Sequence, residues 1–378
     1  MDTPFGHHDS ASHCVGRLTN AGGALRVRIW TVCLAAVVGL GLSSIASPVH
    51  SMAPDAPRRW VLIYAGGPRR PPYTVNDLIR LFGVMDTTNR PRSWLCTGAL
   101  MTEYMTVSGR YYMPWTNGVP STGNDWTQYL DSLFAKGGPL ARVDSAAGLV
   151  AAAVGDSSRR IGLSIMVPYP DPTGDTLRFE SHTYSMKSDK DRAAVVEAYL
   201  HEVRRRLDGA RLAHARFVAF YWLNEGIRAV DTALVPRVAA AVHALGDSII
   251  WIPSFRAAGS LQWRALGFDE AWLQPNYFFD LNIATTRIDS ALTMAHDAGM
   301  GLEMEFDRRL FSEWRYADRV EPYIAALENT PELRNRSVSM YEGGGALIRL
   351  SGSREPWQRA LYARLTQALA PPTPSAGR

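Results

Sequence analysis

Three acidic residues alternate with apolar residues in one short segment of the chain. In the run Gly-Leu-Glu-Met-Glu-Phe-Asp, residues 301–307, the acids are Glu303, Glu305 and Asp307. Successive side chains of a β-strand point to opposite faces, so a strand here carries three carboxylates on one face. An enclosed carboxylate is costly unless it is hydrogen-bonded, protonated or used in chemistry. The pattern therefore predicts the wall of an active site. A structural network of acids paired with Arg, or a Ca²⁺ site on the same face, is the alternative.

A fourth acid, Glu225, lies elsewhere in the chain. It follows the apolar run Phe217–Leu223, with Asn224 just before it. In a parallel barrel the residues that act lie at the C-terminal ends of the strands, so Glu225 and Glu305 would face each other across the mouth. Glycosidic bond cleavage needs such a pair of carboxyl groups. One acid protonates the leaving oxygen, and the other attacks the anomeric carbon or activates water. Glu225 and Glu305 are the candidate catalytic residues.

Other polar and aromatic residues end predicted strands in the same way. Amides and carboxylates make paired hydrogen bonds to hydroxyl groups, and aromatic faces stack on sugar rings, so this composition predicts a sugar-binding mouth. The candidate substrate-binding residues are Tyr169, Tyr221, Asn224, Trp251, Gln274, Asn276, Tyr277, Glu303, Asp307, Tyr341 and Glu342. Parity favours Tyr221 over Trp222 for stacking, because Tyr221 shares the face of Glu225. Tyr277 is the second residue expected to stack.

The elements that would position these residues are eight apolar runs of strand length. They are Trp60–Tyr64, Trp94–Met101, Ile161–Val167, Phe217–Leu223, Ser248–Pro253, Glu270–Gln274, Gly301–Phe306 and Ser337–Tyr341. Most are followed by amphipathic stretches of helical period. The predicted helices include Asn124–Phe134, Asp189–Leu207, Thr232–Leu245, Thr285–Ala298, Asp318–Leu327 and Pro356–Leu369. Strands alternating with helices predict a parallel sheet with helices outside. Eight strands in ~310 residues fit a single-domain α/β fold, a closed (β/α)₈ TIM barrel.

The strand-end acids are similar to those of the large clan of (β/α)₈ retaining glycoside hydrolases. The resemblance rests on Asn224-Glu225 ending the fourth strand and a Glu ending the seventh. It implies that Glu225 is the acid/base, Glu305 the nucleophile, and Asn224 a ligand of the sugar 2-hydroxyl. Gly226 stands where the clan commonly has Pro. An assignment shifted by one layer, with Glu303 as the nucleophile, is the alternative.

Several segments also resemble an exported bacterial family, DUF4855, over about residues 60–365. The family implies little about the substrate. The matching segments are Pro120–Trp126, Pro168–Pro170, Gly267–Asp269, Gln274–Phe279, Gly299–Glu305 and Tyr341–Gly344.

Residues 1–46 are typical of a secretory signal. Arg26 and Arg28 precede an apolar run over 29–42, and small residues lead to Ala46. The run is shorter than the ~20 residues of a membrane span, although an uncleaved anchor is the alternative. We expect a secreted or periplasmic protein, free of the membrane after signal removal. A linker would cover 47–58, the barrel 59–370, and a disordered tail 371–378.

Composition and the lack of certain motifs disfavour several classes of partner and cofactor. The chain of 378 residues is 46% apolar and carries a net charge of +4 without a basic run, so nucleic acid is not an expected partner. Cys14 and Cys33 leave with the signal, and Cys96 is expected to be buried and inert. No Gly-rich nucleotide loop and no Cys/His ligand set occurs, so we expect no cofactor and no metal.

The sequence thus predicts a monomeric glycoside hydrolase that cleaves a poly- or oligosaccharide. A non-catalytic glycan-binding or cell-envelope protein on the same barrel is the alternative. The lack of histidine at the predicted strand ends disfavours a third class, the metal-dependent hydrolases such as deacetylases.

Overall fold

The computed structural model describes residue 52, residues 58–65, residue 67 and residues 71–370, which fall in one compact unit. The predicted signal at 1–46, nearly all of the linker at 47–58 and the tail at 371–378 lie outside the described residues.

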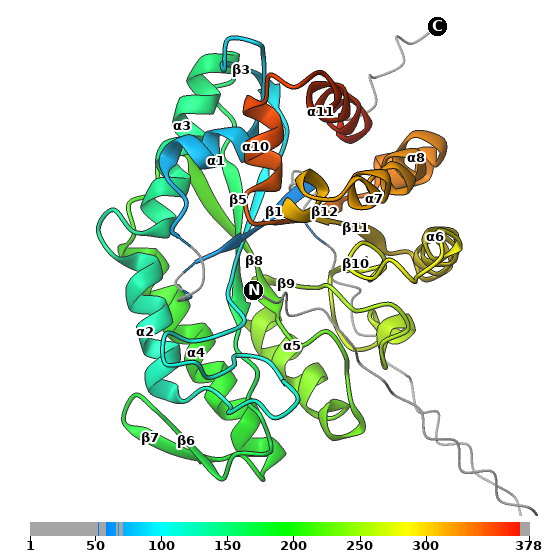
Figure 1. Cartoon of the computed structure of the whole chain (residues 1–378). Coiled ribbons are helices and arrows are strands. Elements are labelled where there is room, and N and C mark those ends of the chain that lie inside the picture. The colour runs from blue at the N-terminus through cyan, green and yellow to red at the C-terminus, as the bar shows by residue number, and fades with distance from the viewer. Residues whose placement is uncertain (1–51, 53–57, 66, 68–70, 371–378) are drawn as a thin grey trace, which may run out of the picture. The chain divides into compact units, whose positions relative to one another are not determined.

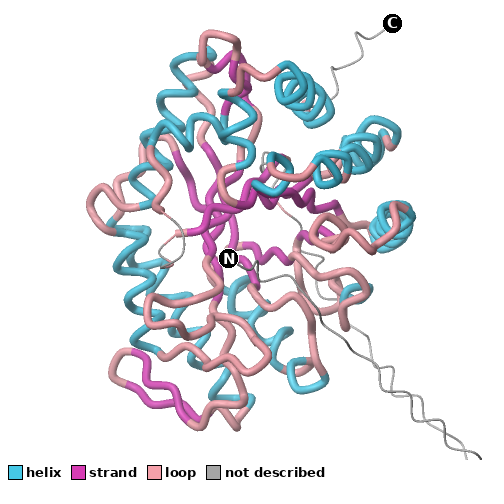
Figure 2. Tube along the Cα trace, viewed as in Figure 1, coloured by secondary structure: helices cyan, strands magenta, loops and turns pink. Residues whose placement is uncertain are grey.

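Eight parallel strands close a barrel in the order β1-β12-β11-β10-β9-β8-β5-β4. Helices surround these strands, which lie in the centre of the molecule (Figures 1 and 2). The barrel strands are β1 (Arg59–Tyr64), β4 (Gly98–Thr102), β5 (Ile161–Val167), β8 (Ala215–Trp222), β9 (Ser248–Trp251), β10 (Glu270–Leu273), β11 (Gly301–Asp307) and β12 (Val338–Gly343). All eight predicted strands are present, which confirms a single-domain (β/α)₈ barrel.

The largest difference from the predicted strand boundaries lies at the second barrel strand. The apolar run Trp94–Met101 was expected to form one strand, but Trp94 ends β3 (Pro91–Trp94), which pairs antiparallel with β2 (Gly83–Met85). The barrel strand β4 starts only at Gly98. Hairpin and barrel strand follow each other without a polar break, so hydrophobicity alone could not separate them. Cys96 lies in the connection and is buried, as predicted. A second hairpin, β6 (Thr176–Phe179) and β7 (His182–Ser185), follows β5.

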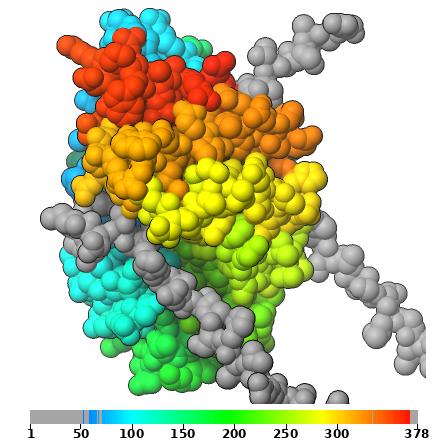
Figure 3. Space-filling view, turned by 45° about the vertical axis from the view of Figure 1, so that its right-hand side comes forward, coloured from blue at the N-terminus to red at the C-terminus, as the bar shows by residue number. Residues whose placement is uncertain are grey.

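Helices cover every connection between barrel strands except one. They are α1 (Val75–Phe82), α2 (Gly123–Phe134), α3 (Pro139–Val154), α4 (Asp189–Gly209), α5 (Leu234–Ala244), α6 (Thr286–Ala298), α7 (Trp314–Asp318), α8 (Glu321–Asn329), α9 (Pro331–Asn335), α10 (Ala346–Gly352) and α11 (Pro356–Leu369). Between β9 and β10 the only helical element is the 3₁₀ turn η2 (Ser260–Gln262). On the face shown in Figure 3, the yellow, orange and red segments of the last third of the chain lie above one another in chain order. None of the described helices has the length and apolar character to cross a membrane.

Local sequence signals explain where several helices begin. Thr122 caps α2 in a capping box with Asp125, whose carboxylate accepts the Thr122 backbone N–H at 2.8 Å. The predicted helix Asp318–Leu327 is instead split: α7 ends at Asp318, and α8 begins at Glu321 with Pro322 in its first turn. Proline has no N–H to donate and suits a helix start, so the chain restarts there.

The strand register decides which side chains fill the barrel. Glu303 pairs with Ser339 and Glu305 with Tyr341 on the neighbouring strand β12, so these four residues share one face of the sheet. Toward the strand starts, the rings of Trp60 and Trp272 lie 5.6 Å apart. Gly301 is required beside them, because a Cβ there would lie 2.5 Å from the Trp272 ring and 2.2 Å from a backbone oxygen. Bulky rings therefore pack the lower barrel, and acidic side chains follow above them.

Candidate active site

β11 carries its acids on the face that lines the barrel interior. Glu303, Glu305 and Asp307 are all buried, and Glu305 has no exposed surface at all. Met304 and Phe306, which alternate with these acids, face the helices. The strand thus encloses three carboxyl groups, as the alternation predicts.

Glu225 lies just after the end of β8 and is partly exposed. Its carboxylate accepts a hydrogen bond from the Ser254 hydroxyl, which follows β9. Burial raises the pKa of Glu225, and this hydrogen bond partly offsets the effect. The charge of Glu225 in turn raises the pKa of both Glu303 and Glu305. The carboxyl group that follows β8 therefore lies close enough to the β11 acids for its charge to act on Glu303 and Glu305.

A small cradle of donors holds the Glu305 carboxyl group. Its Oε2 accepts the Tyr323 hydroxyl at 2.7 Å and the Tyr277 backbone N–H at 3.3 Å, and the Asn276 backbone also donates to the group. Asn276 has φ = +50°, a left-handed conformation that turns consecutive N–H groups toward one acceptor. Burial raises the pKa of Glu305 to about 7, against these donors, which lower it. Oε1 has no hydrogen-bond partner among the described residues.

Glu303 lies one layer deeper, in a poorer environment for charge. Burial, followed by the charges of Glu305 and Glu225, raises its pKa well above the usual range, and only the nearby Ser339 hydroxyl opposes this. Its Oε1 also lacks a hydrogen-bond partner among the described residues. The environment of Glu303 therefore favours its protonated form, whereas the pKa of Glu305 lies at about 7.

Cations do not neutralise this cluster. In the part of the chain that the structure describes, no Arg, Lys or His forms an ion pair with Glu225, Glu303 or Glu305. Asp307 differs, because Arg309 forms an ion pair with it at 3.1 Å and donates its backbone N–H at 2.8 Å. The alternative of a structural acid–Arg network thus describes Asp307 but not the other three acids.

Polar candidates surround the cluster. The Asn224 amide nitrogen is buried without a partner among the described residues, and its backbone oxygen accepts Trp251 Nε1–H at 2.8 Å. Gln274 Oε1 lies 3.3 Å from the Ser254 hydroxyl. Tyr221 points inward and is buried, and the charges of Glu225 and Glu303 add to burial in raising the pKa of its hydroxyl. The structure brings these residues together around the acids.

The remaining aromatic candidates have different surroundings. Tyr277 is buried with the Arg319 guanidinium 3.6 Å above its ring. Tyr341 points inward, edge-on to Phe279 at 5.5 Å. Trp251 is fully buried and stacks on Phe268 at 4.9 Å. It is in register with Trp222, on the helix-facing side, so it packs the core and does not line the mouth.

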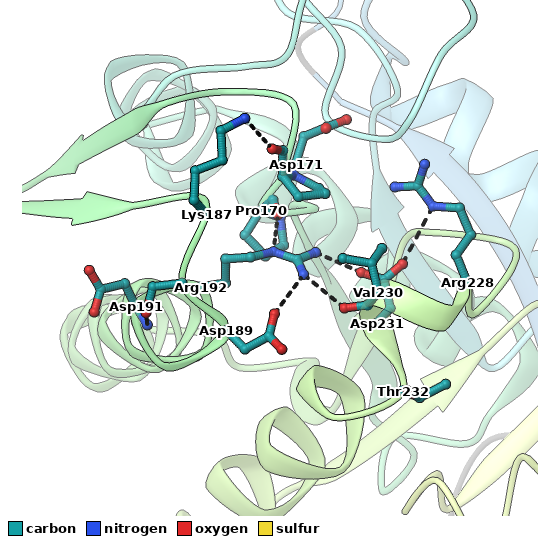
Figure 4. Close-up of polar contacts among 12 residues, drawn as sticks. Pro170, Asp171, Lys187, Asp189, Asp191, Arg192, Arg228, Val230, Asp231 and Thr232 are labelled. Atoms are coloured by element: carbon teal, nitrogen blue, oxygen red, sulfur yellow. Dashed lines mark hydrogen bonds and ion pairs between the residues drawn. The ribbon is translucent and has the colours of Figure 1, made fainter.

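Tyr169 belongs to a separate cluster of charges, part of which Figure 4 shows. Its hydroxyl lies 2.9 Å from Asp231 Oδ1, 3.2 Å from Arg192 Nη2 and 2.5 Å from Arg228 Nη2. The buried Arg192 also forms an ion pair with Asp231 at 2.6 Å and donates to the Pro170 oxygen at 2.8 Å. The Tyr169 hydroxyl therefore links the segment after β5 to helix α4 and to the turn after β8, and it has partners both as a donor and as an acceptor.

Glu342 lies on the opposite side of β12 from Tyr341. It accepts the Leu347 backbone N–H at 3.1 Å and the Tyr73 hydroxyl at 2.9 Å. A carboxylate at the start of α10 satisfies a free backbone donor and the helix dipole. Its place fits a structural role behind the barrel wall.

Several residues at the site were not predicted from the sequence. Tyr323 reaches Glu305 from helix α8, and no local pattern marks it. Ser254 follows a predicted strand end, so the strand-end rule could have found it.

Metal ligation is another use that clustered acids can have. Among the described residues, no group of three or more His, Cys, Asp or Glu side chains is arranged to hold a metal ion.

A cavity of about 1270 Å³ lies elsewhere in the fold. It is lined by residues at or just before strand starts, including Arg59, Thr97 and Arg160, and by Tyr362 of α11. Catalytic groups of such barrels lie at the opposite, C-terminal ends of the strands, so the cavity does not define the active site.

Comparisons with known proteins give the family. The model of a family described as "Domain of unknown function (DUF4855)" matches residues 59–367. No curated protein sequence matches the chain. Among solved structures, the carboxyl transferase domain of Rhizobium etli pyruvate carboxylase, determined with pyruvate, is similar at 8% identity with a TM-score of 0.36. The match covers 82% of this chain and 47% of that one, so this chain spans about half the length of its structural relative.

Proposed function

The chain belongs to the DUF4855 family, and we propose that it is a glycoside hydrolase that cleaves a poly- or oligosaccharide through Glu225 and Glu305. The observation that carries the proposal is the arrangement of these two carboxyl groups. Glu225 follows β8 and Glu305 lies on β11, the charge of Glu225 raises the pKa of Glu305, and neither has a cation partner among the described residues. Buried acids without a cation partner destabilise the folded state. Pairs of acids whose surroundings shift their pKa values are typical of catalytic sites.

The environments assign the two roles. Glu305 accepts three donors that stabilise its anion, which suits the group that attacks the anomeric carbon. Glu225 is held by one hydroxyl and has a raised pKa, which suits the group that protonates the leaving oxygen. Attack forms a glycosyl ester on Glu305 as the glycosidic bond breaks. Glu225, now ionised, then takes a proton from the water that hydrolyses this ester, so the anomeric configuration is retained.

The raised pKa of Glu303 fits this assignment. Its protonated form, which burial favours, adds no negative charge beside Glu305 and so leaves Glu305 easier to ionise. Tyr221, Asn224 and Gln274 supply the inward aromatic face and amide groups that recognise sugar hydroxyls.

A non-catalytic glycan-binding protein is the second candidate, and the complete burial of Glu305 favours it. A nucleophile must be reached by its substrate, whereas a binding protein could use the same barrel without exposing this residue. The two candidates differ in whether sugar products are released.

A polysaccharide panel tests the proposal. The purified protein is incubated with plant, fungal and bacterial polysaccharides, and new reducing ends are measured. Products with retained anomeric configuration in an early NMR spectrum support the roles above. Binding without any product identifies the second candidate instead.

We further propose that the protein acts outside the cytoplasm as a monomer on a carbohydrate partner, without a metal or cofactor. The support is the signal-like N-terminal sequence. Fractionation of cells that express the full chain tests the location, light scattering tests the monomer, and activity after EDTA treatment tests the metal.

A further inference from the structure

Two arginine side chains converge on one aromatic ring at the rim of the barrel. The guanidinium of Arg287 lies 4.3 Å from the centroid of Phe255, and that of Arg256 lies 5.1 Å from it. Phe255 and Arg256 belong to the loop that follows β9, and Arg287 lies in the first turn of α6, after β10. Both connections leave the C-terminal ends of their strands, where the candidate active site lies.

Hydrogen bonds link this rim directly to the candidate catalytic residue. The Phe255 N–H donates to Asn276 Oδ1 at 3.0 Å, and the next residue, Tyr277, donates its N–H to Glu305 at 3.3 Å. Arg287 donates to the Pro275 oxygen in the same loop at 3.1 Å. The arginine pair is therefore fixed to the loop that holds Glu305.

Neither arginine has an acidic partner among the described residues. The charge of Arg256, after burial, lowers the pKa of Arg287, so the two like charges act on each other. Asp280 and Glu305 influence Arg287, but neither forms an ion pair with it. Arg256 is exposed and takes a left-handed backbone conformation, φ = +59°, which is uncommon for a residue other than glycine. Repulsion and backbone strain are thus retained at a place where neither arginine forms an ion pair within the described residues.

We propose that Arg256 and Arg287 form an anion subsite, which binds a carboxylate or sulfate group on the sugar next to the cleaved bond. Guanidinium groups bind such oxyanions through paired, charge-assisted hydrogen bonds, and the planar fork sets the orientation of the ring. One bound anion would relieve the repulsion between the two arginines. The subsite rests on the proposed function only for its position beside the cleaved bond, because anion binding itself needs no catalysis.

The test measures binding in a protein that carries Glu225→Gln, so that hydrolysis does not interfere. Calorimetry compares three sets of short oligosaccharides: neutral, uronate-containing and sulfated. We expect at least one acidic set to bind about tenfold more tightly than the neutral set at low salt, with an affinity that falls as salt is added. The set that binds identifies the anionic group as carboxylate or sulfate.

Three further substitutions locate the subsite. Arg256→Gln should remove the preference for acidic sugars, and Arg287→Lys should weaken it because the charge stays while the fork is lost. Arg264→Gln is the matched control. Arg264 also lies over an aromatic ring, Trp263 at 4.2 Å, but donates to the Ala298 and Gly299 oxygens, at the strand-start end of the barrel. This control should bind as the parent protein does.

The outcomes separate this inference from the proposed function. Selective binding of acidic sugars, without any hydrolysis by the unsubstituted protein, supports the subsite and contradicts the proposed hydrolase activity. Hydrolysis of neutral sugars, unchanged by Arg256→Gln, supports the enzyme and overturns the subsite. Equal binding of neutral and acidic sugars, or no binding of either, also overturns the subsite.

Discussion

Two clusters of buried charge lie near the same end of the barrel, and they are built on opposite principles. In the first, the fully buried Arg192 has carbonyl, carboxylate and hydroxyl acceptors for its donors, including Asp231 at 2.6 Å (Figure 4). In the second, Glu303 and Glu305 each leave an oxygen without a partner among the described residues. A buried ion pair is tolerated when every group is satisfied. The first cluster therefore has the satisfied contacts of a structural site, and the second has the unpartnered carboxyl oxygens that the proposed function requires.

The largest effect is expected from the second cluster. Glu225→Gln and Glu305→Gln should each lower turnover by about a thousandfold or more, because each removes a group that reacts with the substrate. Initial rates on the glycan found in the panel measure the loss. Glu342→Gln is the control, since Glu342 is a buried glutamate of the neighbouring strand that faces away from the mouth. If that variant loses turnover as the others do, buried charge in general would explain the result.

A substitution in the first cluster should lower the free energy of unfolding. Asp231→Asn leaves the buried Arg192 without its closest carboxylate, which should cost about 3–5 kcal/mol of unfolding free energy. Urea denaturation measures this value, and the turnover of the folded protein should stay close to normal. Lys187→Gln, at an exposed ion pair of 3.8 Å in the same region, should change stability by less than about 1 kcal/mol. Equal losses in the two variants would contradict the contrast.

The effect of the second cluster on the free energy of unfolding should depend on pH. The pKa of Glu305 is raised from 4.5 to about 7 in the folded state, so its favourable contribution is complete below pH 4.5 and is lost as the pH rises through 7. The loss is on the order of 3 kcal/mol. Glu305→Gln cannot ionise, so its stability relative to the unsubstituted protein should increase between pH 5 and pH 8. Denaturation curves at both pH values measure the difference, and a constant difference would show that Glu305 does not titrate there.

The smallest effect concerns the donor on α8. Tyr323→Phe removes the hydroxyl that lowers the pKa of Glu305. The acid limb of the rate profile should move to higher pH by on the order of one unit, with activity recovering at alkaline pH. The control is Tyr362→Phe, which removes a buried hydroxyl that binds the Met85 N–H far from the acids. An unshifted profile with a uniformly lower rate would mean that Tyr323 only packs.

Strand positions were predictable because each barrel strand is an apolar run, and alternation placed the β11 acids on one face. Parity also separates Tyr221 from Trp222, and the structure places Tyr221 inward beside Glu225. The same parity places Glu342 on the opposite face of β12 from Tyr341, behind the barrel wall and not among the mouth residues.

Contacts between distant segments could not be predicted in this way. Tyr169 ends a strand and looks like a sugar-stacking residue, but Arg192 and Asp231, from α4 and the turn after β8, engage its hydroxyl. Tyr323 gives no sign in the sequence that its helix points a hydroxyl into the barrel. Such contacts depend on how helices pack against the barrel, which hydrophobic period alone does not determine.

The missing helix between β9 and β10 has a consequence for how the molecule opens. These two strands pair through two residue pairs, whereas β5 and β8 pair through seven and are covered by α4. Local opening is easiest where few contacts and little cover hold a segment, so amide protons of β9 and β10 should exchange with solvent first. The loop with Ser254 and Phe255 leaves this sector. Local opening of the barrel at β9 and β10 would then give the proposed sugar substrate transient access to the buried Glu305. Hydrogen exchange can measure the rate of this opening.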